Sequence, residues 1–102
     1  MIQDMTDIQT LTKEKIKLDE PGLYDVLFLN DSITTMEFVV KVLKQIYGKT
    51  PEQAHDITRR IHEDGQGIVG SYVHEVAEQK GIETTLAARQ ENFPLQVKVK
   101  KQ

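Results

Sequence analysis

Two helix-start signals that follow one another closely restrict the folds open to this chain. Thr34 is followed three residues later by Glu37, and Thr50-Pro51 is followed by Gln53. In such a capping box the threonine hydroxyl accepts a helix N–H, and the side chain three residues on bonds back to the cap. Proline also suits the first helical position, where an N–H has no intrahelical partner. The spacing predicts two short, consecutive helices that begin at Thr34 and Thr50.

Apolar residues and glycines set the extent of these two helices. The first carries apolar residues at helical spacing, Val39, Val42, Leu43 and Ile46. The second carries a shorter stripe, Ala54, Ile57 and Ile61. Glycine commonly ends a helix. We therefore expect the first helix to end at Gly48 and the second at Gly65 and Gly67.

Three other segments have the composition or the alternation of strands. Residues 24–29 are rich in strand formers and run into a turn-forming cluster, Asn30-Asp31-Ser32. Residues 68–72 are apolar with one internal glycine. Residues 95–100 alternate apolar and polar side chains, which predicts a half-buried strand whose lysines discourage edge-to-edge pairing.

A third helix is expected from about Val73 to Gln90, before Phe93-Pro94. Its small-residue face comprises Val76, Ala77, Thr84 and Ala88. Gly81 should weaken this helix by roughly 1 kcal/mol relative to alanine.

The predicted order is β-α-α-β-α-β, which favours an α+β fold with three helices packed on one face of a three-stranded sheet. One domain of residues 21–102 accounts for all of these elements. Residues 1–20 are polar and mixed in charge, with little apolar surface to pack, and are expected to form a flexible N-terminal arm.

Composition excludes several classes of function. The 102 residues contain no cysteine, so disulfides, thiolate catalysis and cysteine-ligated zinc are excluded. A net charge of −3, with both signs interspersed, gives no field to hold nucleic acid. No stretch approaches the roughly 20 apolar residues of a membrane span, and Met1–Thr10 lacks a signal-peptide pattern. We expect a cytoplasmic protein, without membrane or nucleic-acid partners.

The sequence offers little for catalysis or metal binding. His55 and His62 lie seven residues apart, and His74 lies beyond the second helix, so no metal site is expected. No nucleophile–base pair stands out, and Gly65-Gln66-Gly67 precedes a strand rather than the helix that a phosphate loop requires. The chain is expected to be neither an enzyme nor a cofactor-binding protein.

Residues 29–39 are the most informative stretch. Taken alone, they describe only a strand-to-helix loop with an Asx turn. Together with three further blocks, in order and spacing, they resemble the ClpS adaptor family over residues 21–100. The matching blocks are Leu29-Asn30-Asp31, Thr34 and Met36-Glu37-Phe38-Val39; Ile61-His62; Glu75-Val76-Ala77-Glu78 with Lys80; and Phe93-Pro94-Leu95.

The resemblance implies a three-stranded antiparallel sheet with three helices, and a monomeric adaptor. It implies binding of proteins with a destabilising N-terminal residue (Phe, Tyr, Trp or Leu; an N-degron) and their delivery to the Clp protease. The implied partner is the N-terminal domain of a Clp unfoldase of the ClpA or ClpC type, with residues 1–20 engaged during hand-over.

The resemblance also assigns residues to roles. Asn30, Asp31 and His62 would bind the N-terminal amine. The pocket for the first side chain would be formed by Thr34, Met36, Val39, Thr58, Ile61 and Leu95. Glu75 and Lys80 would contact the unfoldase.

Four positions depart from the family's usual pattern. Ser32 stands in place of a second acid, Thr35 in place of a proline, and Val73 in place of a capping threonine. Thr58 replaces a bulky apolar residue at the pocket rim, which leaves the preferred N-terminal residue open.

Two other classes of function remain as alternatives. A ribosome-associated domain like the C-terminal domain of the stalk protein has a similarly compact α/β build, and would bind translation factors without using Asn30, Asp31 or His62. A small enzyme is the third possibility, against which stands the lack of a nucleophile–base pair.

Overall fold

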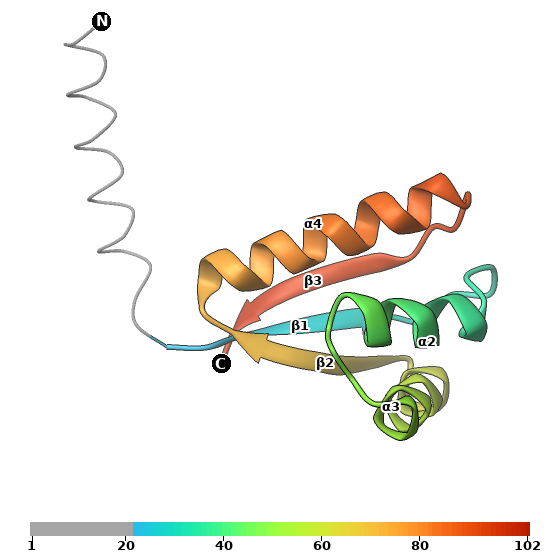
Figure 1. Cartoon of the computed structure of the whole chain (residues 1–102), viewed down its shortest axis with the longest axis horizontal. Coiled ribbons are helices and arrows are strands. Elements are labelled where there is room, and N and C mark those ends of the chain that lie inside the picture. Colours follow the sequence, from blue (N-terminus) through green and yellow to red (C-terminus); the bar gives the residue numbers. More distant parts are fainter. Residues whose placement is uncertain (1–21) are drawn as a thin grey trace, which may run out of the picture.

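A computed structural model describes residues 22–102, and the predicted arm of residues 1–20 lies outside this range. The elements follow the predicted order β-α-α-β-α-β (Figure 1). Their bounds are β1 Tyr24–Leu29, α2 Met36–Gln45, α3 Pro51–Asp64, β2 Gln66–Tyr72, α4 His74–Gln90 and β3 Gln96–Lys101. The strand β2 begins two residues before the expected Ile68.

The sheet has the order β2-β1-β3, with β1 antiparallel to both neighbours. Phe28 on the central strand lies opposite Gly67 on β2 and Val97 on β3. An irregularity between Val26 and Leu27 shifts the register of the β1–β2 pair. The predicted three-stranded antiparallel sheet is confirmed.

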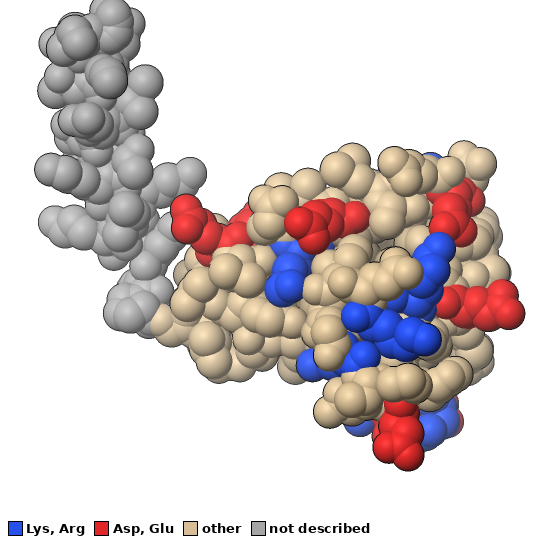
Figure 2. All heavy atoms as spheres, in the orientation of Figure 1, with Lys and Arg blue, Asp and Glu red and all other residues tan. Residues whose placement is uncertain are grey.

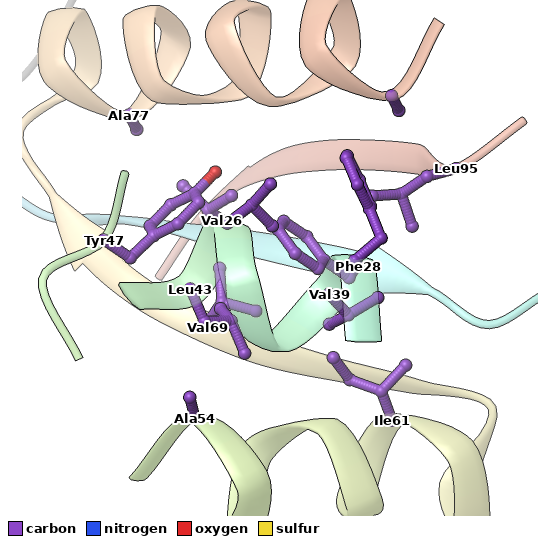
Figure 3. Packing of buried hydrophobic residues seen from close by; sticks show 13 residues of the cluster. Val26, Phe28, Val39, Leu43, Tyr47, Ala54, Ile61, Val69, Ala77 and Leu95 are labelled. Carbon is purple, nitrogen blue, oxygen red and sulfur yellow. The ribbon is translucent and has the colours of Figure 1, made fainter. Parts of the chain in front are cut away.

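The hydrophobic core joins one face of the sheet to the helices (Figure 3). Its members come from every element except β3, together with the segment before that strand: Val26, Phe28, Phe38, Val39, Val42, Leu43, Tyr47, Ala54, Ile61, Val69, Ala77, Ala88 and Leu95. On the other face, Ser71 and Gln102 donate hydrogen bonds to Asp25, and Lys98 and Lys100 are exposed. This face therefore carries polar and charged groups next to the apolar side chains of Leu27 and its partner Ile68.

The start of α2 differs from the prediction. Thr35, not Thr34, is the N-cap, and its hydroxyl accepts the Phe38 N–H at 3.1 Å. The hydroxyl of Thr34 instead donates to Asp31 Oδ2 at 2.8 Å. The predicted capping box of Thr34 and Glu37 is therefore wrong, because the Asp31 carboxylate competes for the Thr34 side chain.

The end of α2 also comes earlier than expected. The helix ends at Gln45, and Gly48 lies two residues past the C-cap Ile46. At Gly48 the chain takes a positive φ of 66°. This turn lets the Lys49 N–H donate to the Leu43 carbonyl at 3.0 Å.

Both ends of α3 follow the sequence signals. Thr50 and Gln53 form the reciprocal capping box, with bonds of 3.2 and 3.0 Å, and Pro51 is the first helical residue. Gly65 caps the C-terminus in the left-handed conformation at φ 90°, which glycine adopts without steric cost.

The last helix, α4, begins without a side-chain cap. Val73 is the N-cap residue and makes no side-chain bond to the helix. Ala77, Thr84 and Ala88 face the core as predicted, but Val76 is exposed, and Gly81 takes its place on the buried face. Within residues 22–102, no helix is both long and apolar enough to cross a membrane.

Candidate functional site

The loop between β1 and α2 is organised by one carboxylate. Asp31 Oδ1 accepts the N–H groups of Ile33 and Thr34 at 2.8 and 2.6 Å, and Oδ2 accepts the Thr34 hydroxyl. Partial burial acts to raise the pKa of Asp31. The hydrogen bonds from Thr34 and Ile33, with the nearby Arg89 guanidinium, outweigh it and hold this pKa below its ordinary value. The loop therefore carries a fixed negative charge.

Arg89 is a contributor that the sequence did not reveal. Its Nη1 donates to the carbonyls of Phe93 and Leu95 at 2.8 and 3.0 Å, which holds the segment between α4 and β3. Its charge also acts on Asp31. Sequence spacing gave no signal for this role, since Arg89 and Asp31 lie far apart along the chain.

The end of β1 is tied to the end of α3. The Asn30 N–H donates to the Gly65 carbonyl at 2.9 Å. His62 is exposed in the last turn of α3, three residues before Gly65. The three residues expected to bind an amine, Asn30, Asp31 and His62, thus belong to two segments that meet at one place. Asn30 is exposed, and Asp31 is half-buried.

A hollow of about 500 Å³ opens between the start of α2 and the middle of α3. Met36, Glu37 and Val40 line it from α2, and His55, Thr58 and Arg59 from α3. Met36 is 47% exposed there. Apolar atoms of Met36 and Val40 are bordered by the charged groups of Glu37 and Arg59, so the hollow suits an apolar side chain that arrives with a polar backbone.

The six residues expected to form the pocket lie in different surroundings in the structure. Met36 and Thr58 line the hollow. Val39, Ile61 and Leu95 are core residues with 7%, 4% and 2% exposure. Thr34 is half-buried and bound to Asp31.

Four lining residues were not predicted: Glu37, Val40, His55 and Arg59. Helical spacing could have found two of them. Val40 lies four residues after Met36, and His55 lies three residues before Thr58, so each shares a helix face with a predicted residue.

Thr58 stands out among the lining residues. It is only 5% exposed, and within residues 22–102 its hydroxyl oxygen has no hydrogen-bond partner. Buried hydroxyls in folded proteins nearly always have a partner.

The two residues expected to contact the unfoldase share a second, shallower hollow. Glu75 and Lys80 line it together with Val76, Gln79 and Glu83, all on α4. Lys80 Nζ also donates to the Ile46 carbonyl at 2.8 Å and lies over the rings of Tyr47 and Tyr72. Lys80 therefore joins α4 to the end of α2 in addition to lining the surface.

Charged groups are unevenly distributed around this region. On the face seen in Figure 2, Lys and Arg side chains run across the middle, over α2, and Asp and Glu side chains lie towards the margins. Lys41 and Lys44 are exposed residues of α2, and Lys41 pairs with Glu91 at 3.0 Å.

The three histidines lie in separate surroundings. His55 lines the hollow, His62 lies in the last turn of α3, and His74 packs against the ring of Tyr24. Over residues 22–102, no group of three His, Asp or Glu residues is placed to hold a metal ion.

Comparison with known proteins identifies the family. A family model described as ATP-dependent Clp protease adaptor protein ClpS matches residues 19–98. The chain belongs to the ClpS adaptor family. The ClpS adapter of Campylobacter jejuni subsp. doylei is 42% identical over 95 residues, which are 93% of this chain and 99% of the relative. The ClpS adapter of Maricaulis maris is 43% identical over 101 residues, 99% of this chain and 91% of the relative.

A solved ClpS structure has the same fold. The ClpS2 protein of Agrobacterium tumefaciens, bound to L-phenylalaninamide, has a TM-score of 0.78 and 30% identity. The match covers 81% of this chain and 100% of that one.

Membership of the ClpS family decides between the classes of function left open above. The chain is an adaptor of the Clp protease and not an enzyme, as predicted. Its partners are a Clp chaperone and the substrates of that protease. The ribosomal alternative is set aside.

Proposed function

We propose that this ClpS adaptor binds the free N-terminus of a polypeptide whose first residue is Phe, Tyr, Trp or Leu. One observation carries the proposal: the loop with Asn30 and Asp31, which leads into α2, is hydrogen-bonded to the end of α3, which carries His62, and a hollow opens between these same two helices. The ligand would place its charged amine among these polar groups and its first side chain in the hollow. The L-phenylalaninamide bound by the related ClpS2 has this same pairing of a free amine and an apolar side chain.

The chemistry of an N-terminal amine suits these three residues. With a pKa of about 7.7–8, the α-amine is largely protonated near neutral pH and presents three donors. Asp31 would supply the opposite charge, and its carboxylate, with about four lone-pair sites, can accept a bond beyond the three from its own loop. Asn30 would accept through its amide oxygen, and neutral His62 through one ring nitrogen.

The side-chain pocket would use Met36 at its mouth, because an unbranched thioether adapts to rings of different shape. Thr34, Val39, Thr58, Ile61 and Leu95 would form or support its walls. Burial of one large apolar side chain contributes about 1.5–3 kcal/mol. Each hydrogen bond to the charged amine adds about 1.5–3 kcal/mol, and lost rotational and translational freedom removes several. These contributions allow at most a micromolar complex, about −8 kcal/mol, and such an affinity lets the cargo be released.

The test compares two peptides that differ only at the first nitrogen. A fluorescent peptide with a free N-terminal Phe should bind with micromolar affinity in an anisotropy titration. Its N-acetylated twin, without charge and with fewer donors, should bind at least 100-fold more weakly, since it loses two or more charge-assisted bonds. Equal binding of the two peptides would contradict the proposal.

A variant series locates the amine site. His62→Ala should weaken the free peptide at least tenfold, because it removes one acceptor for a charged donor. His55→Ala is the matched control, since His55 lines the hollow but is not assigned to the amine. A larger loss from His55→Ala than from His62→Ala would place the amine elsewhere.

We further propose that Glu75 and Lys80 dock the adaptor on the N-terminal domain of a ClpA- or ClpC-type unfoldase. The unfoldase would engage residues 1–20 during hand-over. The adaptor would act as a monomer in the cytoplasm. Lys80 is a poor first target, because it also bonds to the Ile46 carbonyl. Glu75→Gln should instead weaken the unfoldase complex and slow degradation of an N-terminal Phe reporter, with peptide affinity unchanged. Glu83→Gln, in the same hollow, is the control. Unchanged degradation with Glu75→Gln would exclude its role.

A further inference from the structure

Thr58 carries a buried hydroxyl and lines the hollow between α2 and α3. The residue is only 5% exposed, and its Oγ1 has no hydrogen-bond partner among residues 22–102. The residue nevertheless lines the hollow between α2 and α3 together with Met36 and Val40. A hydroxyl in this state can both donate and accept a hydrogen bond, and gains from any polar group brought within reach.

A threonine inside a helix usually has a local way to satisfy its hydroxyl. Its Oγ1 can donate to a carbonyl three or four residues back in the same helix. Thr84 does this in α4, where its hydroxyl donates to the Lys80 carbonyl at 2.8 Å. Thr58 makes no such bond to Ala54 in α3. Among residues 22–102, no carbonyl therefore uses the bonding capacity of this hydroxyl.

Access to this hydroxyl requires a side chain that can move, since the oxygen itself meets almost no solvent. Met36 lines the same hollow and is 47% exposed. Its three rotatable bonds and unbranched chain let it shift at little cost. A ligand ring entering beside Met36 would reach the wall that Thr58 forms.

We propose that Thr58 is a specificity-determining residue, whose hydroxyl bonds to the phenol of an N-terminal tyrosine. This rests on the proposed function, and it narrows the ligand within the class Phe, Tyr, Trp and Leu. A tyrosine phenol can donate to or accept from Thr58, whereas phenylalanine leaves the Thr58 hydroxyl without a partner. A site with a hydrogen-bonding group discriminates against the analogue that lacks the matching group.

The experiment measures dissociation constants for three peptides that differ only in the first residue: Tyr, Phe and 4-methylphenylalanine. The last has nearly the shape of tyrosine without its hydroxyl. Wild-type protein should bind the Tyr peptide about tenfold more tightly than the 4-methylphenylalanine peptide, as one hydrogen bond allows. In Thr58→Val, which keeps the side-chain shape, this ratio should fall to about one or reverse, and the Tyr peptide should lose more affinity than the Phe peptide. Thr58→Ser keeps the hydroxyl and should keep the preference for Tyr.

The outcomes separate this inference from the function on which it rests. If wild-type protein binds none of the free peptides, the proposed function is overturned, and this inference with it. If all three peptides bind but Thr58→Val leaves the Tyr preference unchanged, Thr58 does not bond to the phenol and this inference alone is overturned. The inference alone also fails if Thr58→Val weakens all three peptides equally. Unchanged circular dichroism confirms that each variant is folded.

Discussion

Two buried threonines, one near each end of α2, differ in their hydrogen bonding. Beside its C-terminal end, Thr84 on α4 is fully buried, and its hydroxyl bonds both to the Tyr47 hydroxyl at 2.8 Å and to the Lys80 carbonyl. Beside its N-terminal end, Thr58 on α3 is nearly as buried, and its hydroxyl has no hydrogen-bond partner in the part of the chain that the structure describes. The residue type and the burial are alike, but the hydrogen bonding differs.

The surroundings of the two threonines explain the difference. Around Thr84, burial raises the pKa of Tyr47 to about 12, and Lys80 closes the end of α2 by bonding to the Ile46 carbonyl. The polar groups at this end of α2 are therefore bonded to one another within the chain. Around Thr58, a hollow and a half-exposed Met36 leave space. The buried hydroxyl of Thr84 is thus paired within the chain, whereas that of Thr58, a residue that lines the hollow, keeps its bonding capacity.

The largest effect on stability is expected from Thr84→Val. The substitution removes two hydrogen bonds and leaves the Tyr47 hydroxyl with only the Lys80 carbonyl at 3.3 Å. We expect a loss of about 2 kcal/mol in the free energy of unfolding, measured by urea denaturation. Peptide affinity should not change. If the free energy of unfolding stays within about 0.5 kcal/mol of wild type, the bonds of Thr84 do not stabilise the fold, and the contrast with Thr58 is lost.

A smaller loss is expected from Thr35→Ala at the start of α2. The variant lacks the hydroxyl that accepts the Phe38 N–H, and loss of an N-cap costs about 1 kcal/mol. Thr34→Ala serves as the comparison, because Thr34 bonds to Asp31 and does not cap the helix. Helix destabilisation by Thr34→Ala alone, with Thr35→Ala neutral, would restore the capping box that the sequence suggested.

Thr58→Val should change stability in the opposite direction from Thr84→Val. The substitution removes an unpaired buried hydroxyl and breaks no bond, so we expect a neutral effect or a gain of about 0.5 kcal/mol. The same urea titration checks it. A loss as large as that of Thr84→Val would mean that Thr58 has a partner in solution, and the contrast between the two threonines would not hold.

The smallest effect concerns the pH dependence of stability. The pKa of Asp31 is lowered in the folded protein, so its carboxylate stabilises the fold above its ordinary pKa of 3.8, and this stabilisation is lost as the pH falls through the folded value. Asp31→Asn should therefore be less stable than wild type at pH 7, and the difference should shrink below about pH 4. Thermal unfolding over this range measures it. A constant difference at every pH would show that the charge plays no part.

Much of the fold could be predicted because its signals are local. The box of Thr50 and Gln53, the glycine at 65 and the run 24–29 each specify structure through near neighbours. The start of α2 was missed because Asp31, three residues away, captures the Thr34 hydroxyl. Thr34 and Thr35 can each act as an N-cap, and the sequence pattern alone does not show which of them does.

The candidate site was harder to predict than the fold. The family resemblance pointed to Met36 and Thr58, which line the hollow, but also to Val39, Ile61 and Leu95, which are buried in the core. Apolar residues at helical spacing look the same in a sequence whether they face a ligand or the core. Arg89 could not be found, because its contact with the loop depends on how α4 packs against the rest of the fold.

The bond between the Asn30 N–H and the Gly65 carbonyl has a consequence for motion. It fastens the loop that carries Asp31 to the end of the helix that carries His62, so the two segments can separate only by breaking a backbone hydrogen bond. In hydrogen exchange, the Asn30 amide should be protected for longer than the exposure of its side chain suggests, with or without peptide. Under the proposed function, this bond would let the adaptor meet each successive cargo with its amine site already assembled.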